Sequence, residues 1–245
     1  MRWRGPPSKE ALSQCPGDFA LARLVSVSNV PRTSRWRLAC FDLDGTLVRG
    51  TSVSQHLADR FGQTEQMAAL ERRYATGEIS NSVVAEEQAR NYRGIPLSQV
   101  VEELSDIVCI DGIDPTLASL RERGIESLLG TVTWSFAAEE FRRRHGFAAV
   151  SGTEIDLDPG GVPTGGVKRH FDEWDKLEFV ASYCDANDID LAECIAVGDS
   201  RSDVPLFEAV GLSIALNATP QAREVASVAV DTENLIDILD LIPWE

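Results

Sequence analysis

Short apolar runs alternate with amphipathic segments along most of the chain. The apolar runs are typical of buried strands, whereas apolar positions three or four residues apart are typical of helices. Predicted strands cover residues 38–42, 125–131, 148–153, 194–198, 212–216 and 227–230. Predicted helices cover residues 115–123, 135–145, 176–187, 204–210, 219–225 and 234–241. This alternation predicts an α/β fold with a Rossmann-like, doubly wound parallel sheet and helices on both faces.

The interval 52–110 interrupts this alternation, because it contains no convincing strand and its spacing predicts three or four amphipathic helices. In open parallel sheets the ligand crevice lies beyond the carboxyl ends of the strands, so helices inserted after the first strand are expected to cover a site there. We therefore expect a loosely ordered N-terminal extension over residues 1–35, a core formed by 36–51 and 111–245, and a small helical cap over 52–110.

One further segment differs in composition from its surroundings. Residues 152–166 contain five glycines and two prolines. Both residue types interrupt regular structure, so this segment is expected to be an excursion or flap.

Charge and cysteine content narrow the possible partners. The formal net charge of −16 argues against nucleic acid and membrane partners, since both bind through clustered lysine and arginine. No stretch approaches the ~20 apolar residues of a membrane span. The five cysteines include no CxxC pair and fit free thiols in a reducing compartment, which predicts a cytoplasmic location. The sequence does not determine the oligomeric state.

The first predicted strand ends in a pair of acids. Asp42 and Asp44 lie one residue apart and are followed at once by Gly45. In extended backbone, alternate residues share a face, so the two carboxylates are expected to lie on the same side. Carboxylates this close repel each other unless a cation or a shared proton compensates. The segment therefore predicts an acidic site that holds a cation.

Other predicted strand ends and helix starts offer residues that would complete such a site. Asp199 and Asp203 follow a second apolar strand, and carboxylate oxygens are ligands that Mg²⁺ prefers. Thr131 ends another strand with a hydroxyl, and Lys176 lies at the start of a helix. Each has an ordinary alternative: a turn and helix cap for the acids, a strand-end hydroxyl for the threonine, and a surface position for the lysine.

These residues together resemble the haloacid dehalogenase-like hydrolases, and within them the branch related to phosphoserine phosphatase. The similarity covers about residues 36–242 and rests on DLDGT at 42–46, the strand ending at Thr131, Lys176, and GDSRSD at 198–203. The resemblance implies a Rossmann-like core, a small helical cap inserted after the first strand, and Mg²⁺ as cofactor.

The resemblance also implies a role for each motif residue in phosphate ester hydrolysis. Asp42 would be the nucleophile that forms an aspartyl-phosphate, and Asp44 would be the general acid and base. Thr131 and Lys176 would bind the phosphoryl oxygens.

The metal ligands implied by the family come from the same two acidic segments. Mg²⁺ would be held by the Asp42 side chain, the Asp44 main-chain carbonyl and Asp199, with Asp203 either as a further ligand or behind the residues that bind the ion directly.

The residues expected to recognise the substrate depart from the phosphoserine phosphatase pattern. Those enzymes carry a glutamate nine residues after the nucleophile and an arginine in the cap, whereas this chain has Thr51 and Gln88 there, with Arg90 close by. Trp134 ends the second motif, and we expect it to pack within the protein rather than stack on a substrate ring. Thr51, Gln88, Arg90 and Trp134 are therefore candidate specificity residues.

The function predicted from the sequence is a magnesium-dependent phosphatase of a small phosphorylated metabolite, acting as a phosphoric monoester hydrolase. The alternatives are phosphoserine phosphatase itself and phosphotransfer from the aspartyl-phosphate to an alcohol. A third alternative, from another class, is a catalytically silent binding protein that keeps the fold.

Overall fold

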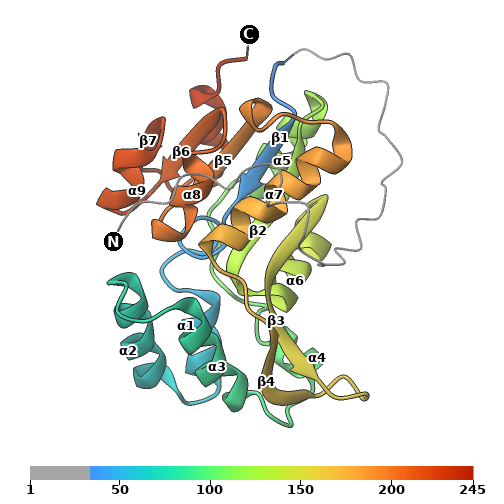
Figure 1. Ribbon diagram of the computed structural model, residues 1–245, viewed down its shortest axis with the longest axis vertical. Helices are drawn as coiled ribbons and strands as arrows, with labels where there is room; N and C mark the ends of the chain where they lie inside the picture. The colour runs from blue at the N-terminus through green and yellow to red at the C-terminus, as the bar shows by residue number, and fades with distance from the viewer. Residues whose placement is uncertain (1–33, 245) are drawn as a thin grey trace, which may run out of the picture.

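The structure, a computed structural model, describes residues 34–244, so nearly all of the predicted extension 1–35 lies outside the described residues. The described strands form one seven-stranded sheet in the order β4-β3-β2-β1-β5-β6-β7 (Figure 1). The strands are β1 (Leu38–Phe41), β2 (Glu126–Trp134), β3 (Ala149–Leu157), β4 (Pro163–Arg169), β5 (Cys194–Gly198), β6 (Leu212–Leu216) and β7 (Val228–Val230). Every neighbouring pair is parallel except β3 with β4. The predicted Rossmann-like α/β class is therefore confirmed.

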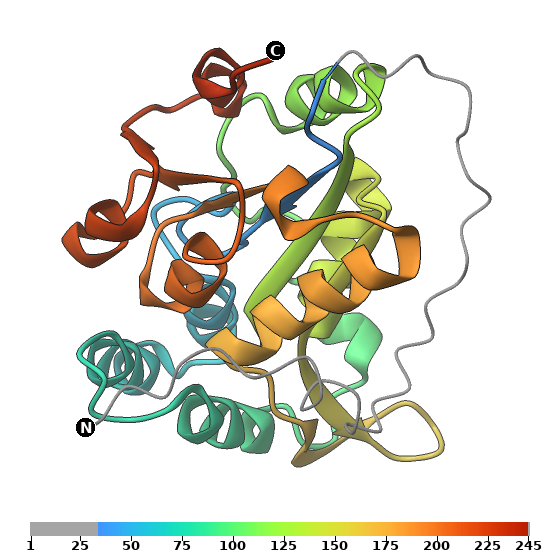
Figure 2. The same ribbon diagram turned by 45° about the horizontal axis from the view of Figure 1, so that its top comes forward.

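Helices cover both faces of the sheet, as Figures 1 and 2 show. The elements on one face are α5 (Ile113–Glu122), α6 (Ser135–His145) and the 3₁₀ helix η4 (Leu235–Leu241). Those on the other face are α7 (Glu173–Asn187), α8 (Val204–Phe207) and α9 (Pro220–Val225). The predicted helix over 234–241 is thus a 3₁₀ helix, and the one predicted over 204–210 is shorter than expected.

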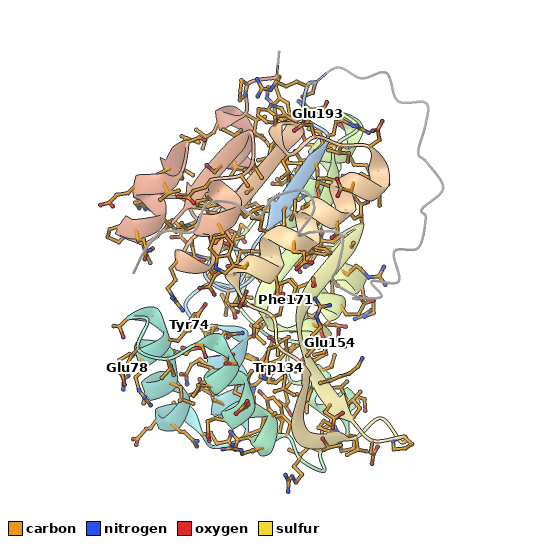
Figure 3. The ribbon with its side chains drawn as sticks, viewed as in Figure 1. Tyr74, Glu78, Trp134, Glu154, Phe171 and Glu193 are labelled. Atoms are coloured by element: carbon orange, nitrogen blue, oxygen red, sulfur yellow. The ribbon has the colours of Figure 1, made fainter. Side chains whose placement is uncertain are left out.

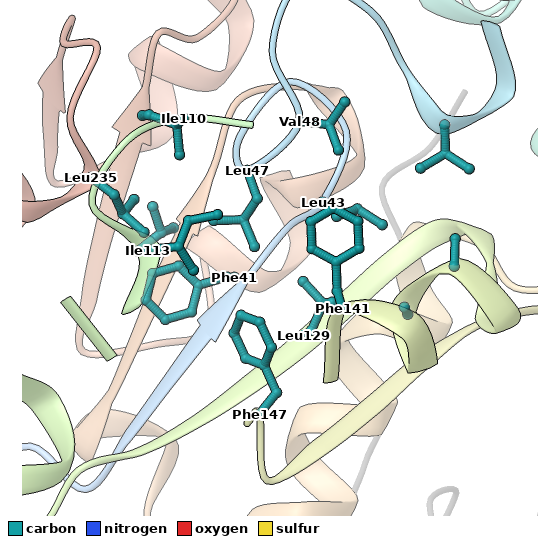
Figure 4. Close-up of a cluster of buried hydrophobic side chains, with 14 of the residues drawn as sticks. Phe41, Leu43, Leu47, Val48, Ile110, Ile113, Leu129, Phe141, Phe147 and Leu235 are labelled. Carbon is teal, nitrogen blue, oxygen red and sulfur yellow. The ribbon is translucent and has the colours of Figure 1, made fainter. Parts of the chain in front are cut away.

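The alternation of side chains along β1 divides the core between these two layers. Ala39 and Phe41 belong to the cluster with α5 and α6, and Leu38 and Cys40 to the cluster with α7. Figure 4 shows Phe41 beside Phe147 and Leu129 in the first cluster. All four residues of β1 are buried. A strand buried on both faces is held in register, so the residues that follow it are placed accurately.

Four helices are inserted between β1 and α5, in the interval where the sequence predicted three or four. They are α1 (Val53–Arg60), α2 (Thr64–Ala75), α3 (Asn81–Asn91) and α4 (Leu97–Glu102). Figure 1 places the first three beyond the carboxyl ends of the strands. Leu57 and Ala89 join the main core, while Met67 and Leu70 form a small cluster of their own with neighbouring residues. None of the helices in the described part of the chain is both long and apolar enough to cross a membrane.

The glycine-rich segment 152–166, predicted as an excursion or flap, forms the end of β3, the turn and the start of β4 in a hairpin. β3 and β4 pair antiparallel, with Leu157 opposite Pro163. The strand β4 was not predicted, because proline and glycine are unfavourable in strand interiors. Here Pro163 is the first residue of an edge strand, where the missing N–H costs little.

The side chain of Asn81 helps to tie the inserted helices to the sheet. The Nδ2 atom of Asn81, the first residue of α3, donates to the main-chain oxygens of Val132 at 2.7 Å and Phe171 at 2.9 Å. Buried main-chain oxygens need such partners, so these bonds hold α3 beside the end of β2. The inserted helices are therefore fixed over the sheet edge where the predicted acids lie.

Candidate active site

A cavity of about 800 Å³ lies between the carboxyl edge of the sheet and the inserted helices. Asp42, Asp44, Thr131 and Asp199 line it from the sheet. The loop before the inserted helices contributes Thr51 and Ser52, and the helices contribute Ser54, Glu71, Tyr74, Asn81 and Gln88, among others. The cavity thus brings together most of the predicted site residues with helix residues that are distant in sequence.

Asp42 is held at the end of β1 by main-chain and side-chain bonds. Its N–H donates to the oxygen of Val197 in β5 at 2.9 Å, which continues the strand pairing one residue beyond β1. Burial and the neighbouring Asp203 carboxylate raise the pKa of Asp42 to about 6, although Lys176 opposes this shift. The carboxylate is therefore rigidly placed in an environment where its charge needs a partner.

Asp44 lies at the junction of the loop with the first inserted helix. Its Oδ1 accepts a hydrogen bond from the main-chain N–H of Val53 at 2.7 Å, and Val53 is the first residue of α1. Burial raises the pKa of Asp44 to about 8, even though the bond from Val53 lowers it. A carboxyl group with a raised pKa can hold and release a proton near neutral pH.

Lys176 is buried between two of the predicted acids. Its Nζ donates to Asp42 Oδ1 at 2.9 Å and to Asp203 Oδ1 at 2.6 Å, and the side chain is 1% exposed. Burial alone would lower the pKa of Lys176, but the charges of Asp203 and Asp42 outweigh it, so the pKa is raised and the amine is a cation. The surface position that the sequence left open is therefore excluded.

Three acids gather where β1 and β5 end. Carboxylate oxygens of Asp42, Asp199 and Asp203 lie within 4.8 Å of one another. Burial and the charges of Asp42 and Asp203 raise the pKa of Asp199 well above its usual range. Lys176 compensates only part of this negative charge, so a hard divalent cation fits the electrostatics and the donor set.

The three acids differ in how many hydrogen bonds their carboxylate oxygens already accept. Asp203 Oδ1 accepts from Lys176, and its Oδ2 accepts from the main-chain N–H groups of Asp199 at 3.0 Å and Ser200 at 3.1 Å. Asp42 and Asp199 line the cavity, while Asp203 lies behind them. Asp203 therefore positions Lys176 and the Asp199 loop, and Asp42 and Asp199 present oxygens to the cavity.

Gly45 allows the acidic loop to approach Asp199. Its φ is +85°, and a Cβ atom there would lie 2.3 Å from Asp199 Oδ2. We expect Gly45→Ala to lower the free energy of unfolding by about 2 kcal/mol or more, through left-handed strain and the displacement of Asp199.

Gly62 offers a matched control for this measurement. It has a similar φ of +74°, but a Cβ atom there would meet no side chain or main-chain atom of the described residues within 4 Å, apart from its own chain neighbours. Gly62→Ala should therefore show only the backbone cost of about 1–2 kcal/mol in denaturant unfolding, with unchanged activity. Equal losses of stability and activity in the two variants would contradict a contact between residue 45 and Asp199.

Thr131 does not end its strand, contrary to the prediction. β2 continues to Trp134, but its pairing with β3 is irregular between Gly130 and Trp134. The Thr131 side chain is buried at the cavity wall, and its Oγ1 accepts from the N–H of Thr133 at 3.3 Å. The irregularity therefore leaves the hydroxyl at the sheet edge although the strand goes on.

The four candidate specificity residues fall into different environments. Thr51 lines the cavity, and its hydroxyl donates to the main-chain oxygen of Ser52. Gln88 is buried at the cavity wall. Arg90 is 57% exposed, pairs with Glu87 and does not line the cavity, so its predicted role in recognition is not supported.

Trp134 packs within the protein, as expected. Its ring is 1% exposed and lies parallel to Phe136, with centroids 5.7 Å apart and an interplanar angle of 13°. Its Nε1 donates to Gln88 Oε1 at 2.9 Å. Trp134 therefore contributes to the site in two ways: it lines the cavity wall, and its hydrogen bond holds the Gln88 side chain in place.

The structure adds site residues that the sequence reasoning did not identify. Glu71 lines the cavity and accepts a hydrogen bond from Ser52 Oγ, and burial raises its pKa. The guanidinium of Arg201 lies 4.3 Å from the centre of the Tyr74 ring. Arg201 lies within the GDSRSD motif, and this motif could have marked it as a site residue. Nothing in the helical pattern distinguishes Glu71 or Tyr74 from their neighbours.

The fold and the site together define the class: an α/β enzyme whose acidic centre lies at the carboxyl edge of a parallel sheet, under helices inserted after the first strand. The family model of the haloacid dehalogenase-like hydrolases matches residues 39–208, and the chain belongs to this family. The resemblance predicted from the motifs is therefore confirmed.

Two of the relatives found by sequence are phosphoserine phosphatases. The chain is 28% identical over 207 residues to that of Archaeoglobus fulgidus, covering 84% of this chain and 60% of the relative. It is 27% identical over 208 residues to phosphoserine phosphatase SerB2 of Mycobacterium tuberculosis, covering 84% of this chain and 50% of the relative. The chain thus spans only 60% and 50% of the lengths of these two proteins.

A solved structure shows the same fold. A phospho-aspartyl intermediate analogue of phosphoserine phosphatase superposes with a TM-score of 0.75 at 23% identity, covering 85% of this chain and 99% of that chain. This similarity confirms the architecture of sheet and inserted helices.

Proposed function

We propose that this protein is a magnesium-dependent phosphatase that hydrolyses a small phosphomonoester through an aspartyl-phosphate on Asp42. The observation that carries the proposal is the contact of Asp42 with the buried Lys176 at 2.9 Å, beside Asp199 at the cavity wall. A buried cation beside a carboxylate at the floor of a cavity suits a phosphoryl group that carries several negative oxygens.

In the first step Asp42 acts as the nucleophile and Asp44 as the general acid. A carboxylate oxygen of Asp42 forms a bond to phosphorus as the ester bond between phosphorus and the alcohol oxygen breaks. Asp44, which accepts a hydrogen bond from the N–H of Val53 at the start of α1, gives its proton to that alcohol oxygen. Lys176 and the Thr131 hydroxyl bind phosphoryl oxygens, so that charge developing on them is stabilised.

The second step regenerates the enzyme. Water attacks phosphorus as the bond from phosphorus to Asp42 breaks, and Asp44 takes the proton of the water. Mg²⁺, held by the side chains of Asp42 and Asp199 and the main-chain carbonyl of Asp44, would neutralise charge between the carboxylate and the phosphate. The residues present fit this ion, because hard oxygen donors gather there and Lys176 leaves negative charge uncompensated.

Chelation of the metal provides the first test. We expect phosphate release from a panel of metabolite phosphomonoesters, including phosphoserine, to fall at least about a hundredfold in EDTA. Adding Mg²⁺ in excess should restore it, as followed by a colorimetric phosphate assay. Turnover that persists in EDTA, or no turnover of any phosphomonoester in Mg²⁺, would overturn the proposal.

A further inference from the structure

Three buried side-chain atoms in the described residues lack a hydrogen-bond partner: Gln88 Nε2, Tyr74 Oη and Arg201 Nε. All three residues line the same cavity. Figure 3 labels Tyr74 and Trp134, the neighbour of Gln88, at the junction of the inserted helices with the sheet. An unsatisfied buried polar group costs about 1–3 kcal/mol, so groups that share a cavity point to a ligand that satisfies them.

The orientation of the Gln88 amide follows from its neighbours. Its Oε1 lies 2.9 Å from Trp134 Nε1 and 3.1 Å from Ser54 Oγ. An indole nitrogen can only donate, so the amide oxygen must face Trp134. The opposite orientation would bring two donors together. The NH₂ group of Gln88 is therefore turned away from Trp134 and keeps its two hydrogens for another acceptor.

We propose that Gln88 Nε2 donates a hydrogen bond to an uncharged oxygen, a hydroxyl or carbonyl, on the alcohol part of the substrate. This inference rests on the proposed phosphatase function and names the substrate class: phosphate esters of hydroxylated alcohols, such as polyols or sugars. Gln88 is then a specificity residue, and the remainder of the reaction does not depend on it.

The charges around the cavity favour an uncharged group at this position. The side chains bonded to the Gln88 amide, Ser54 and Trp134, are uncharged, and Ser54 lies 3.4 Å from the equally uncharged Thr133 hydroxyl. The acids that line the cavity are Asp42, Asp44, Glu71 and Asp199. A substrate carboxylate beside Gln88 would be buried without a cation bonded to that amide, which is unfavourable.

Arg201 is the one lysine or arginine among the described residues that line the cavity. Arg201 stacks on the ring of Tyr74, and its Nη1 lies 3.9 Å from Glu173. A substrate carboxylate is therefore expected to pair with Arg201, which leaves Gln88 Nε2 to an uncharged oxygen of the substrate.

The test compares substrates that differ only in hydroxyl groups. Glycerol 3-phosphate and erythritol 4-phosphate are each measured against the alkyl phosphate of equal chain length, propyl or butyl phosphate. We expect the parent enzyme to prefer a hydroxylated ester at least about tenfold in kcat/KM, and Gln88→Met to remove most of this preference by slowing the hydroxylated ester alone.

A second variant separates recognition from structure. Gln88→Glu keeps an oxygen acceptor for Trp134 and Ser54 and, as a carboxylate, has no donor, so at a pH where this carboxyl group is ionised it should lose the same preference without the packing defect of methionine. If both variants slow the hydroxylated and alkyl esters equally, the role of Gln88 is structural and the inference is wrong.

Gln55 provides the matched control. It also lines the cavity, but its Nε2 already donates to Asp59 Oδ1 at 2.9 Å and to the main-chain oxygen of Thr64 at 3.1 Å. Gln55→Met should leave the preference for hydroxylated esters unchanged. A parent enzyme that hydrolyses phosphoserine in preference to all four esters, independently of Gln88, would overturn the inference and leave the phosphatase proposal intact. Failure to hydrolyse any ester would instead contradict the phosphatase proposal.

Discussion

Replacing Asp42 with asparagine is expected to lower phosphate release at least about a thousandfold, because the amide is a poor nucleophile and the aspartyl-phosphate cannot form. The substitution nearly preserves the volume of the side chain, and Lys176 keeps its bond to Asp203 at 2.6 Å. We therefore expect a folded protein, with a circular dichroism spectrum like that of the parent. Steady-state kinetics on the best substrate of the panel measures the loss.

The control for this variant is an acid outside the site. Asp185 is exposed on α7 and does not line the cavity, so Asp185→Asn should keep the parent activity. Mass spectrometry adds an independent readout, since a phosphorylated intermediate trapped by acid should be found on the parent and not on Asp42→Asn. If Asp42→Asn retains parent activity in a folded protein, another residue must be the nucleophile.

Lys176→Met is expected to have the second large effect, on both activity and stability. The variant leaves Asp42 and Asp203 buried without their shared cation, and removing one partner of a buried ion pair costs about 3–5 kcal/mol in the free energy of unfolding. Turnover should fall at least about a hundredfold, because a charged donor to the phosphoryl oxygens is lost. Urea denaturation and steady-state kinetics measure the two losses.

Two further variants separate these effects. Lys168→Met removes a lysine that is 66% exposed and paired with Glu154, so stability should change by less than about 1 kcal/mol. Adding Asp203→Asn to Lys176→Met removes one of the two unpaired carboxylates and should recover part of the lost stability, but not the activity. A Lys176→Met protein as stable as its parent would contradict the buried ion pairs.

The acids that follow β1 and β5 could be placed from the sequence. Each apolar run predicts a buried strand, and parallel strands end at the same edge of a sheet, so Asp42 and Asp199 had to be neighbours if their strands were. Phe41 of β1 pairs with Val197 of β5, so the two strands are neighbours. Lys176 could be predicted only as a candidate, because a helical position does not show whether a lysine is buried.

Residues of the inserted helices could not be ranked from the sequence. Gln88 and Arg90 are two positions apart in α3, which is a rotation of about 200° around the helix axis. One therefore lies at the cavity wall and the other is exposed beside Glu87. Which side faces the sheet depends on contacts such as those of Asn81 with Val132 and Phe171, and these join residues far apart in the chain.

The sequence by itself determined the α/β class, the insertion after the first strand and the acidic motif, because periodicity and short motifs are local properties of the chain. Only the tertiary structure decided that the glycine-rich segment belongs to the hairpin of β3 and β4, that Lys176 bridges Asp42 and Asp203, and that Gln88 rather than Arg90 reaches the cavity. These features depend on the packing of distant segments against one another, where burial and the pairing of charges are decided by neighbours that the local sequence does not contain.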